Sequence, residues 1–341
     1  MQISELRDRV SRELLAFAWN EWAQMGVLSE ARSESPWAAD PEAHLLFTLQ
    51  IARDDPRLFD ETLDWFSTNA ALVSAQRLRN MAAEDEDKRL AEAAIAWVAK
   101  HRGRFRGFSA KPLPMPEAPQ PLFYGMHKTT DDDESFSAFG FRRSPFQPSK
   151  KSRRPDLRRP INFGFRLRNV FGLGVRAEVM RFLLTASRHA PPGRRPRFST
   201  PAIADEAGFA KRNVHDALVA LAEAGSIELS VIGREHFYAV DVAAWSAALG
   251  VEDSPIYRDW THILLGLREL HRWLAEAESA DFTPYMLASE ARLKMGEIQS
   301  SFTHAGMPLR EARPAEGADY WEVFVDLVEQ MLKQYRSELP F

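Results

Sequence analysis

The sequence predicts a mainly α-helical protein in which several groups of helices are accompanied by one small β-hairpin. Three observations predict this class. Apolar residues recur every three to four positions over most of the chain, the connections between these periodic segments are short, and a single stretch near residue 233 has the pattern of two paired strands. With 341 residues, the chain is long enough for two or three domains.

Composition and charge exclude several classes of protein. The chain has 44 Lys and Arg against 48 Asp and Glu, and 45% of its residues are hydrophobic, which is ordinary for a globular protein. Cysteine is absent, which excludes disulfides, thiolate-bound zinc or iron–sulfur clusters, and cysteine nucleophiles. No apolar run approaches the ~20 residues that a membrane helix needs, and the N-terminus lacks a signal-peptide core. We therefore expect a cytoplasmic protein with no membrane partner.

Residues 1–102 are predicted to form an N-terminal helical bundle. Leu6, Val10 and Leu14 follow a helical spacing and lie on one face of the first helix. The triplet Asp40-Pro41-Glu42 marks the start of the second helix, because an acidic side chain caps free amide groups and proline suits the first helical position. Three more amphipathic segments follow with short connections, which indicates a bundle.

Residues 103–160 are predicted to form a basic, proline-rich linker, mostly disordered or extended, because no hydrophobic period survives there. Between residues 100 and 168, sixteen Lys and Arg stand against six Asp and Glu, a charge of +10, so the rest of the chain carries −14. Two interpretations fit this asymmetry: an anionic partner for this part of the chain, or a solvated linker that repels itself. Aromatic residues such as Phe136 and Phe141 are unusual in a linker and indicate that parts of it dock on a folded surface.

Residues 161–243 are predicted to form a compact unit of helices and one hairpin. After a first helix and a basic, proline-rich loop, Thr200-Pro201 begins a short helix that Gly208 ends. Residues 211–224 form the next helix. Two short strands then frame a tight turn at Gly233.

In this order of elements, residues 172–241 resemble the winged helix-turn-helix domain of bacterial transcriptional regulators. The resemblance is carried by the turn Ala207-Gly208-Phe209, by Ala210-Lys211-Arg212-Asn213-Val214-His215 at the start of the third helix, and by the run Leu218-x-x-Leu221-x-x-x-Gly225-x-Ile227. It covers about a fifth of the chain. It implies a hairpin wing and sequence-specific binding of double-stranded DNA. The flanking helical regions are also similar to those of antitoxins that repress their own operons.

The third helix presents hydrogen-bond donors at the end that a recognition helix directs into the major groove. Arginine can bind the O6 and N7 atoms of guanine, and asparagine the N6 and N7 atoms of adenine. Residues near the second helix would contact phosphate, and the hairpin would reach the adjacent backbone or minor groove. The predicted DNA-binding residues are Thr200, Lys211, Arg212, Asn213, His215, Arg234, His236, Arg194, Arg195 and Arg197. Non-specific phosphate contacts are predicted for Arg153, Arg154, Arg158 and Arg159.

The alternative function is a protein-interaction module. Winged-helix domains also bind proteins, and Glu206, Asp216 and Glu235 dilute the basic face. In this interpretation the chain is an antitoxin that neutralises a partner from a toxin–antitoxin or defence operon through its N-terminal helices, with secondary DNA binding. A homodimer is expected from the symmetry of operators.

Residues 244–341 are predicted to form a C-terminal helical region, and no motif predicts an enzyme or a cofactor. The stripe of leucines from 264 to 274 is either buried or a dimer seam, and the tryptophans are either core residues or the lining of a ligand pocket. No nucleophile elbow, phosphate-binding loop or His-Glu-x-x-His motif is present. His262 and His271 share a predicted helix with Glu269, but structural roles are far commoner for such residues, so no metal site is predicted.

Overall fold

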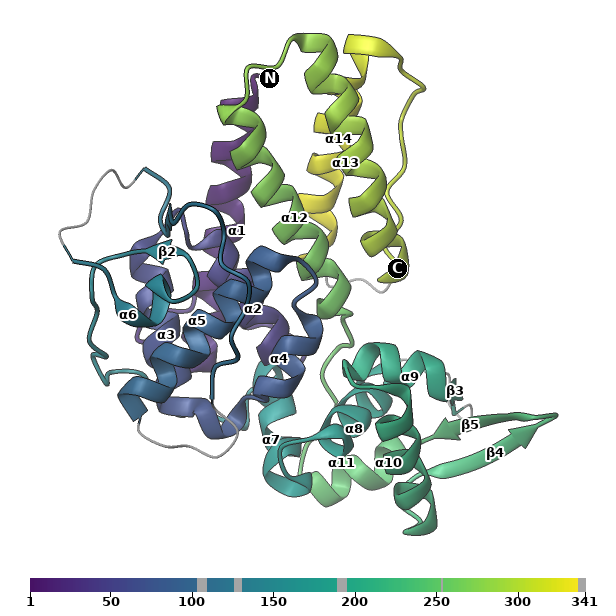
Figure 1. Ribbon diagram of the computed structural model, residues 1–341. Coiled ribbons are helices and arrows are strands. Elements are labelled where there is room, and N and C mark those ends of the chain that lie inside the picture. The colour runs from purple at the N-terminus through teal and green to yellow at the C-terminus, as the bar shows by residue number, and fades with distance from the viewer. Residues whose placement is uncertain (103–108, 126–130, 189–194, 253, 337–341) are drawn as a thin grey trace.

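The computed structural model describes residues 1–102, 109–125, 131–188, 195–252 and 254–336. Within these ranges the protein is mainly helical, as the sequence predicts, and it has one sheet of two strands and one of three where the sequence predicts a single hairpin. Figure 1 shows a helical bundle, a group of long helices beside it, and a smaller unit that carries a projecting hairpin. None of the described helices is both long and apolar enough to cross a membrane.

The bundle is built around one central helix. Its helices are α1 (Ile3–Met25), α2 (Pro41–Ile51), α3 (Pro56–Asn69), η1 (Ala70–Leu72), α4 (Ala75–Met81) and α5 (Asp85–Arg102). Every residue of α2 is buried, because α1, α3, α4, α5 and a later helix all pack against it. The predicted start of α2 is confirmed, since the Asp40 side chain accepts a hydrogen bond from the Ala43 amide at 3.1 Å.

The segment expected to be a linker is packed on this bundle over its described residues, 109–125 and 131–160. It contains the parallel strands β1 (Gln120–Pro121) and β2 (Phe141–Arg142) and the short helix α6 (Glu134–Ser137). The side chains of Leu122, Phe136 and Phe141 are fully buried in the bundle core. Burial of these apolar side chains provides the stabilisation that a polar linker would lack.

Most of residues 161–243 form a unit around a second hydrophobic core, which also includes Ala38, whereas Ile161 and Phe165 lie in the bundle core. Its elements are η2 (Pro160–Asn162), α7 (Phe163–Phe171), α8 (Val175–Ala186), β3 (Phe198–Ser199), α9 (Thr200–Ala207), α10 (Lys211–Glu223), β4 (Glu228–Ile232) and β5 (Glu235–Ala239), followed by α11 (Val242–Leu249). The strand order is β3-β5-β4, all antiparallel, so the strand before α9 joins the hairpin in one sheet. Leu183 of α8, Ile203 of α9 and Leu218 of α10 are fully buried in the core of the unit.

The C-terminal helices share their core with the bundle and do not fold separately from it. They are α12 (Trp260–Ser279), α13 (Pro284–His304), η3 (Gly317–Asp319) and α14 (Tyr320–Gln334). The leucine stripe on α12 is buried inside the chain, so it is not a dimer seam. Its members are Leu264, Leu267, Leu270 and Leu274. Six of the tryptophans are likewise core residues: Trp22, Trp37, Trp65, Trp97, Trp260 and Trp273.

Candidate nucleic-acid interface

The start of α10 is an exposed, donor-rich surface. Lys211, Arg212, Asn213 and His215 are all exposed, while Val214 between them is buried in the unit's core. This division follows from the helical period, because the apolar face of α10 is needed to cover α8 and α9. Within the described part of the chain, neither Lys211 nor Arg212 forms an ion pair, so both charges face solvent.

The first amide groups of α10 add to this surface. The residue before the helix, Ala210, has no side-chain oxygen with which to cap them. The positive end of the helix dipole therefore lies beside the exposed cations, an arrangement that attracts anions such as phosphate.

The hairpin extends the same surface. It projects from the unit in Figure 1, and its two-residue turn has Gly233 at φ +64° and exposed Arg234 beside it. The ring of His236 on β5 is nearly parallel to that of His215 on α10, with centroids 6.4 Å apart. The helix and the hairpin thus meet along one face.

Arg176 belongs to this face and was missed by the sequence analysis. It is exposed in the first turn of α8 and lines a cavity of about 330 Å³ together with Asn213 and Asp216 of α10. No local pattern could reveal this, because α8 and α10 are brought together only by the packing of the three helices.

Two of the predicted residues are engaged within the unit itself. Thr200, the first residue of α9, is only 7% exposed, so its side chain is largely buried and its contact with phosphate stays a prediction. The guanidinium of Arg195 binds Glu228 and lies 2.6 Å from Asp241; because all three side chains are at least 41% exposed, these are surface ion pairs that hold Arg195 only weakly. Arg197 is exposed, and Arg194 lies outside the described residues.

The four arginines predicted to contact phosphate from a linker are held on the bundle instead. Arg153 donates its amide to the Gly26 carbonyl at 2.8 Å, and its own carbonyl accepts a bond from Asn69 at 3.0 Å. The side chains of Arg153, Arg154 and Arg158 are exposed, and that of Arg159 is half-buried. Their charges are therefore available from a fixed surface.

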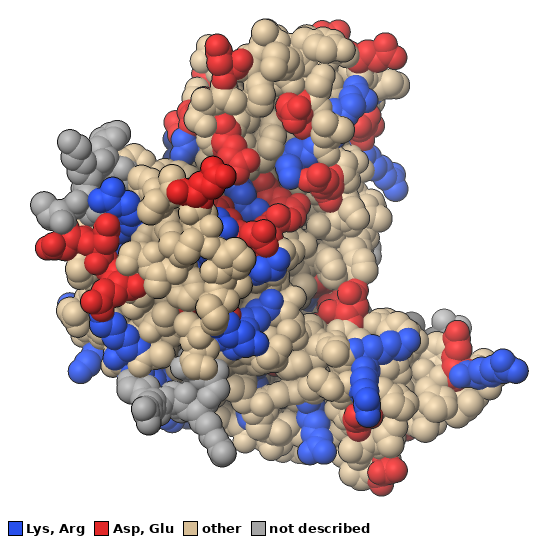
Figure 2. Space-filling model, in the orientation of Figure 1, with Lys and Arg blue, Asp and Glu red and all other residues tan. Residues whose placement is uncertain are grey.

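The charge of the unit is mixed. Residues 161–243 contain eleven Lys and Arg against eight Asp and Glu, a net charge of +3. In Figure 2, basic and acidic side chains both appear on the unit's visible face. Long-range attraction of an anion is accordingly modest, so an anion bound at this surface would depend on the local donors of α10.

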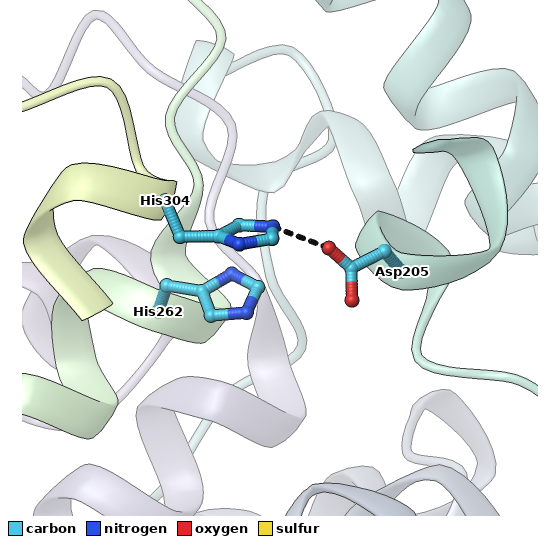
Figure 3. Close-up of side chains that lie close together, drawn as sticks. All are labelled: Asp205, His262 and His304. Atoms are coloured by element: carbon cyan, nitrogen blue, oxygen red, sulfur yellow. Dashed lines mark hydrogen bonds and ion pairs between the residues drawn. The ribbon is translucent and has the colours of Figure 1, made fainter. Parts of the chain in front are cut away.

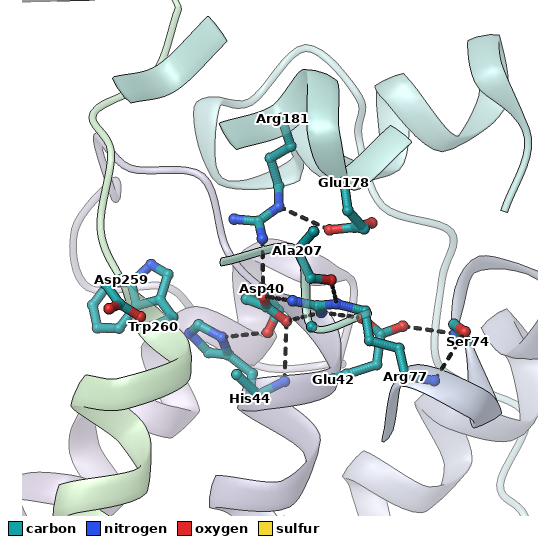
Figure 4. Close-up of polar contacts among 12 residues, drawn as sticks. Asp40, Glu42, His44, Ser74, Arg77, Glu178, Arg181, Ala207, Asp259 and Trp260 are labelled. Carbon is teal, nitrogen blue, oxygen red and sulfur yellow. Dashed lines mark hydrogen bonds and ion pairs between the residues drawn. The ribbon is translucent and has the colours of Figure 1, made fainter. Parts of the chain in front are cut away.

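A buried network of ion pairs joins this unit to the bundle (Figure 4). Arg77 of α4 binds both Asp40 and Glu42, at 2.8 Å for Glu42, and donates from Nε to the Ala207 carbonyl of α9 at 2.7 Å. On the other side of the junction, Arg168 binds Glu42 at 2.6 Å and Arg181 binds Asp40 at 3.0 Å. A third carboxylate completes the network: Glu178, which pairs with both Arg168 and Arg181.

The network fixes the charge state of its members. Burial opposes the charge of Asp40, but Arg77 and Arg181 outweigh burial and hold the pKa of this carboxyl well below its usual value. In the same way burial is outweighed for Glu178, whose pKa is lowered to about 2 by Arg168, Arg77 and Arg181. Three arginines thus balance three carboxylates at a junction from which water is excluded.

Two arrangements of the described histidines bear on a metal site. His271 has the structural role that the sequence predicts for it: it is buried, and its Nε2 atom lies 2.9 Å from Asp54. Three other residues that the sequence did not connect lie together: Asp205 of α9, His262 of α12 and His304 of α13. One potential metal-ligand atom from each lies within 4.8 Å of the other two.

Comparison with known proteins identifies no relative of this chain: no family profile, no curated protein sequence and no solved structure matches it.

Proposed function

We propose that the chain is a cytoplasmic, sequence-specific DNA-binding transcriptional regulator that uses a winged helix-turn-helix within residues 161–243. The order helix, strand, helix, helix, hairpin, with the first strand paired to the hairpin, supports this fold. One observation carries the function: the exposed donors of Lys211, Arg212 and Asn213 lie at the start of α10, on the face that the hairpin extends.

The residues divide by the part of DNA that they would contact. With the start of α10 in the major groove, Arg212 is suited to guanine and Asn213 to adenine. Lys211 and Arg176 flank these positions and would bind phosphate. Arg234 at the tip of the hairpin would reach the neighbouring backbone or minor groove.

A second candidate function is that of a protein-binding module, such as an antitoxin. The hairpin favours it, because Leu229, Val231 and Ile232 of β4 are 45%, 60% and 57% exposed. Exposed apolar side chains on an edge strand are typical of surfaces that bind another protein. A homodimer that binds a symmetric operator would use such a surface equally well.

The test is a fluorescence-anisotropy titration of the full chain with DNA from upstream of its own gene, at two salt concentrations, with shuffled DNA as the competitor. We expect tighter binding to the native sequence and weaker binding at the higher salt. The Arg12→Ala variant should bind DNA as the unmodified chain does, because Arg12 is an exposed arginine on α1, away from the α10 surface. Equal affinity for both DNAs, or none for either, would contradict the proposal, and the second outcome would direct the search to a protein partner.

A further inference from the structure

Asp205, His262 and His304 converge from three helices where the hairpin-bearing unit meets the C-terminal helices (Figure 3). The carboxylate of Asp205 accepts a hydrogen bond from Nε2 of His304. The rings of His262 and His304 stack with centroids 3.9 Å apart. Two imidazoles and one carboxylate are therefore gathered by residues that are up to 99 positions apart in the sequence.

The ring of His262 is held in place by a neighbouring carboxylate. Its Nδ1 atom lies 2.7 Å from Oδ2 of Asp259, while Oδ1 of the same carboxylate accepts the His262 amide at 3.0 Å. A carboxylate that accepts the proton of Nδ1 leaves the lone pair of Nε2 free. Metal-binding histidines are commonly oriented by a carboxylate in this way.

We propose that Asp205, His262 and His304 form a binding site for a divalent transition-metal ion, with Zn²⁺ as the best match. Two imidazole nitrogens and one carboxylate oxygen are a ligand set that suits Zn²⁺, and three protein ligands leave a fourth position for water or an external ligand. The side chains of Asp205 and His304 are 45% and 49% exposed, so an ion can enter from solvent. The metal would replace the hydrogen bond between these two side chains.

The location gives the site a structural consequence. Asp205 belongs to α9, whereas His262 and His304 belong to α12 and α13, so an ion bound by all three ties the unit to the C-terminal helices. The metal site does not depend on DNA binding, and its test is independent of the proposed function.

The experiment is a titration of the untagged, metal-free full chain with Zn²⁺ by calorimetry, and with Co²⁺ by visible absorption. We expect one ion per chain and the intense absorption bands of four-coordinate Co²⁺. The variants His262→Ala, His304→Ala and Asp205→Asn should each weaken binding at least tenfold. Circular dichroism of each metal-free variant checks that it folds.

Two further variants test whether the metal binds at this cluster and depends on the orientation of His262. Asp259→Asn keeps an oxygen to cap α12 but turns an amide group toward His262, so we expect 10- to 100-fold weaker metal binding without a loss of helix. The matched control removes the other neighbouring pair of histidines, His215→Ala with His236→Ala, and should leave the affinity unchanged. Binding that is lost in this control, or no stoichiometric binding of Zn²⁺ or Co²⁺ by the unmodified chain, would overturn the proposal.

Discussion

Replacing Arg77 by methionine tests whether the buried ion-pair network holds the hairpin-bearing unit on the bundle. Arg77 is fully buried, and its guanidinium binds Asp40, Glu42 and the carbonyl of Ala207. Methionine preserves most of the volume but none of these bonds. Two arginines would then face three carboxylates, and the junction would hold one uncompensated negative charge.

The expected cost is large because the charge cannot be solvated. Removing one partner from a buried, hydrogen-bonded ion pair lowers the free energy of unfolding by about 3–5 kcal/mol. The measurement is urea-induced unfolding of the full chain, followed by circular dichroism. In the control Arg12→Met, an exposed arginine is changed in the same way, and we expect an effect of about 0.5 kcal/mol or less.

A double variant makes the reasoning refutable. Adding Asp40→Asn to Arg77→Met restores the balance of charge, and asparagine can still cap α2 through the bond to Ala43. We expect the double variant to be more stable than the sum of the two single effects predicts, by about 1 kcal/mol or more. Additive losses, or a loss below about 1 kcal/mol in Arg77→Met alone, would show that the network does not hold the unit in place.

Three further predictions concern pH and DNA. The folded-state pKa of Glu178 is lowered to about 2, so the stability from its pairing is complete above pH ~4.5 and is lost as the pH falls toward 2. At pH values below 5 the urea concentration at the midpoint of unfolding should therefore decrease, and it should decrease less steeply in Glu178→Gln. Parallel pH profiles of the two proteins would contradict this. Arg212→Ala should cost about 1–3 kcal/mol on the specific DNA site but less on shuffled DNA, and equal losses would make Arg212 a phosphate contact. Non-specific affinity for DNA is predicted from four arginines on the bundle: Arg153, Arg154, Arg158 and Arg159. Replacing all four by alanine should reduce the salt dependence of DNA binding by up to about four ion equivalents, whereas an unchanged slope would show that they do not contact phosphate.

Local patterns predict most of the helices because their causes are local. The spacing of Leu6, Val10 and Leu14, the cap at Asp40 and the glycine that ends α9 each act within one or two turns of helix. The sheet is different. The hairpin is local and was predicted, whereas the pairing of β3 with β5 joins Phe198 to Tyr238 across forty residues and leaves no pattern in either strand.

The candidate surfaces divide in the same way. Lys211, Arg212 and Asn213 could be predicted because they are adjacent in the sequence and share one helix end. Arg176, which lines the cavity between α8 and α10, could not be predicted, and neither could the cluster of Asp205, His262 and His304, because each depends on how separate helices pack. The packed state of residues 109–125 and 131–160 was obscured for another reason: their charge and proline content are typical of a linker, and only the aromatic residues indicated burial.

The contact between α4 and the turn before α10 joins the two candidate functions physically. Arg77 binds the carbonyl of Ala207, and Asn80 donates to the carbonyl of Gly208 at 3.2 Å. At Gly208, φ is +67° and an added Cβ would lie 3.0 Å from Nε of Arg77, so glycine allows this close approach. A partner bound to the bundle can change the orientation of α10 only if it favours a state in which α4 has moved. Because that state breaks a buried ion-pair network, such a partner must bind the displaced state far more tightly than the docked one. A partner that binds both states equally well would leave the α10 surface unchanged, however tight its binding.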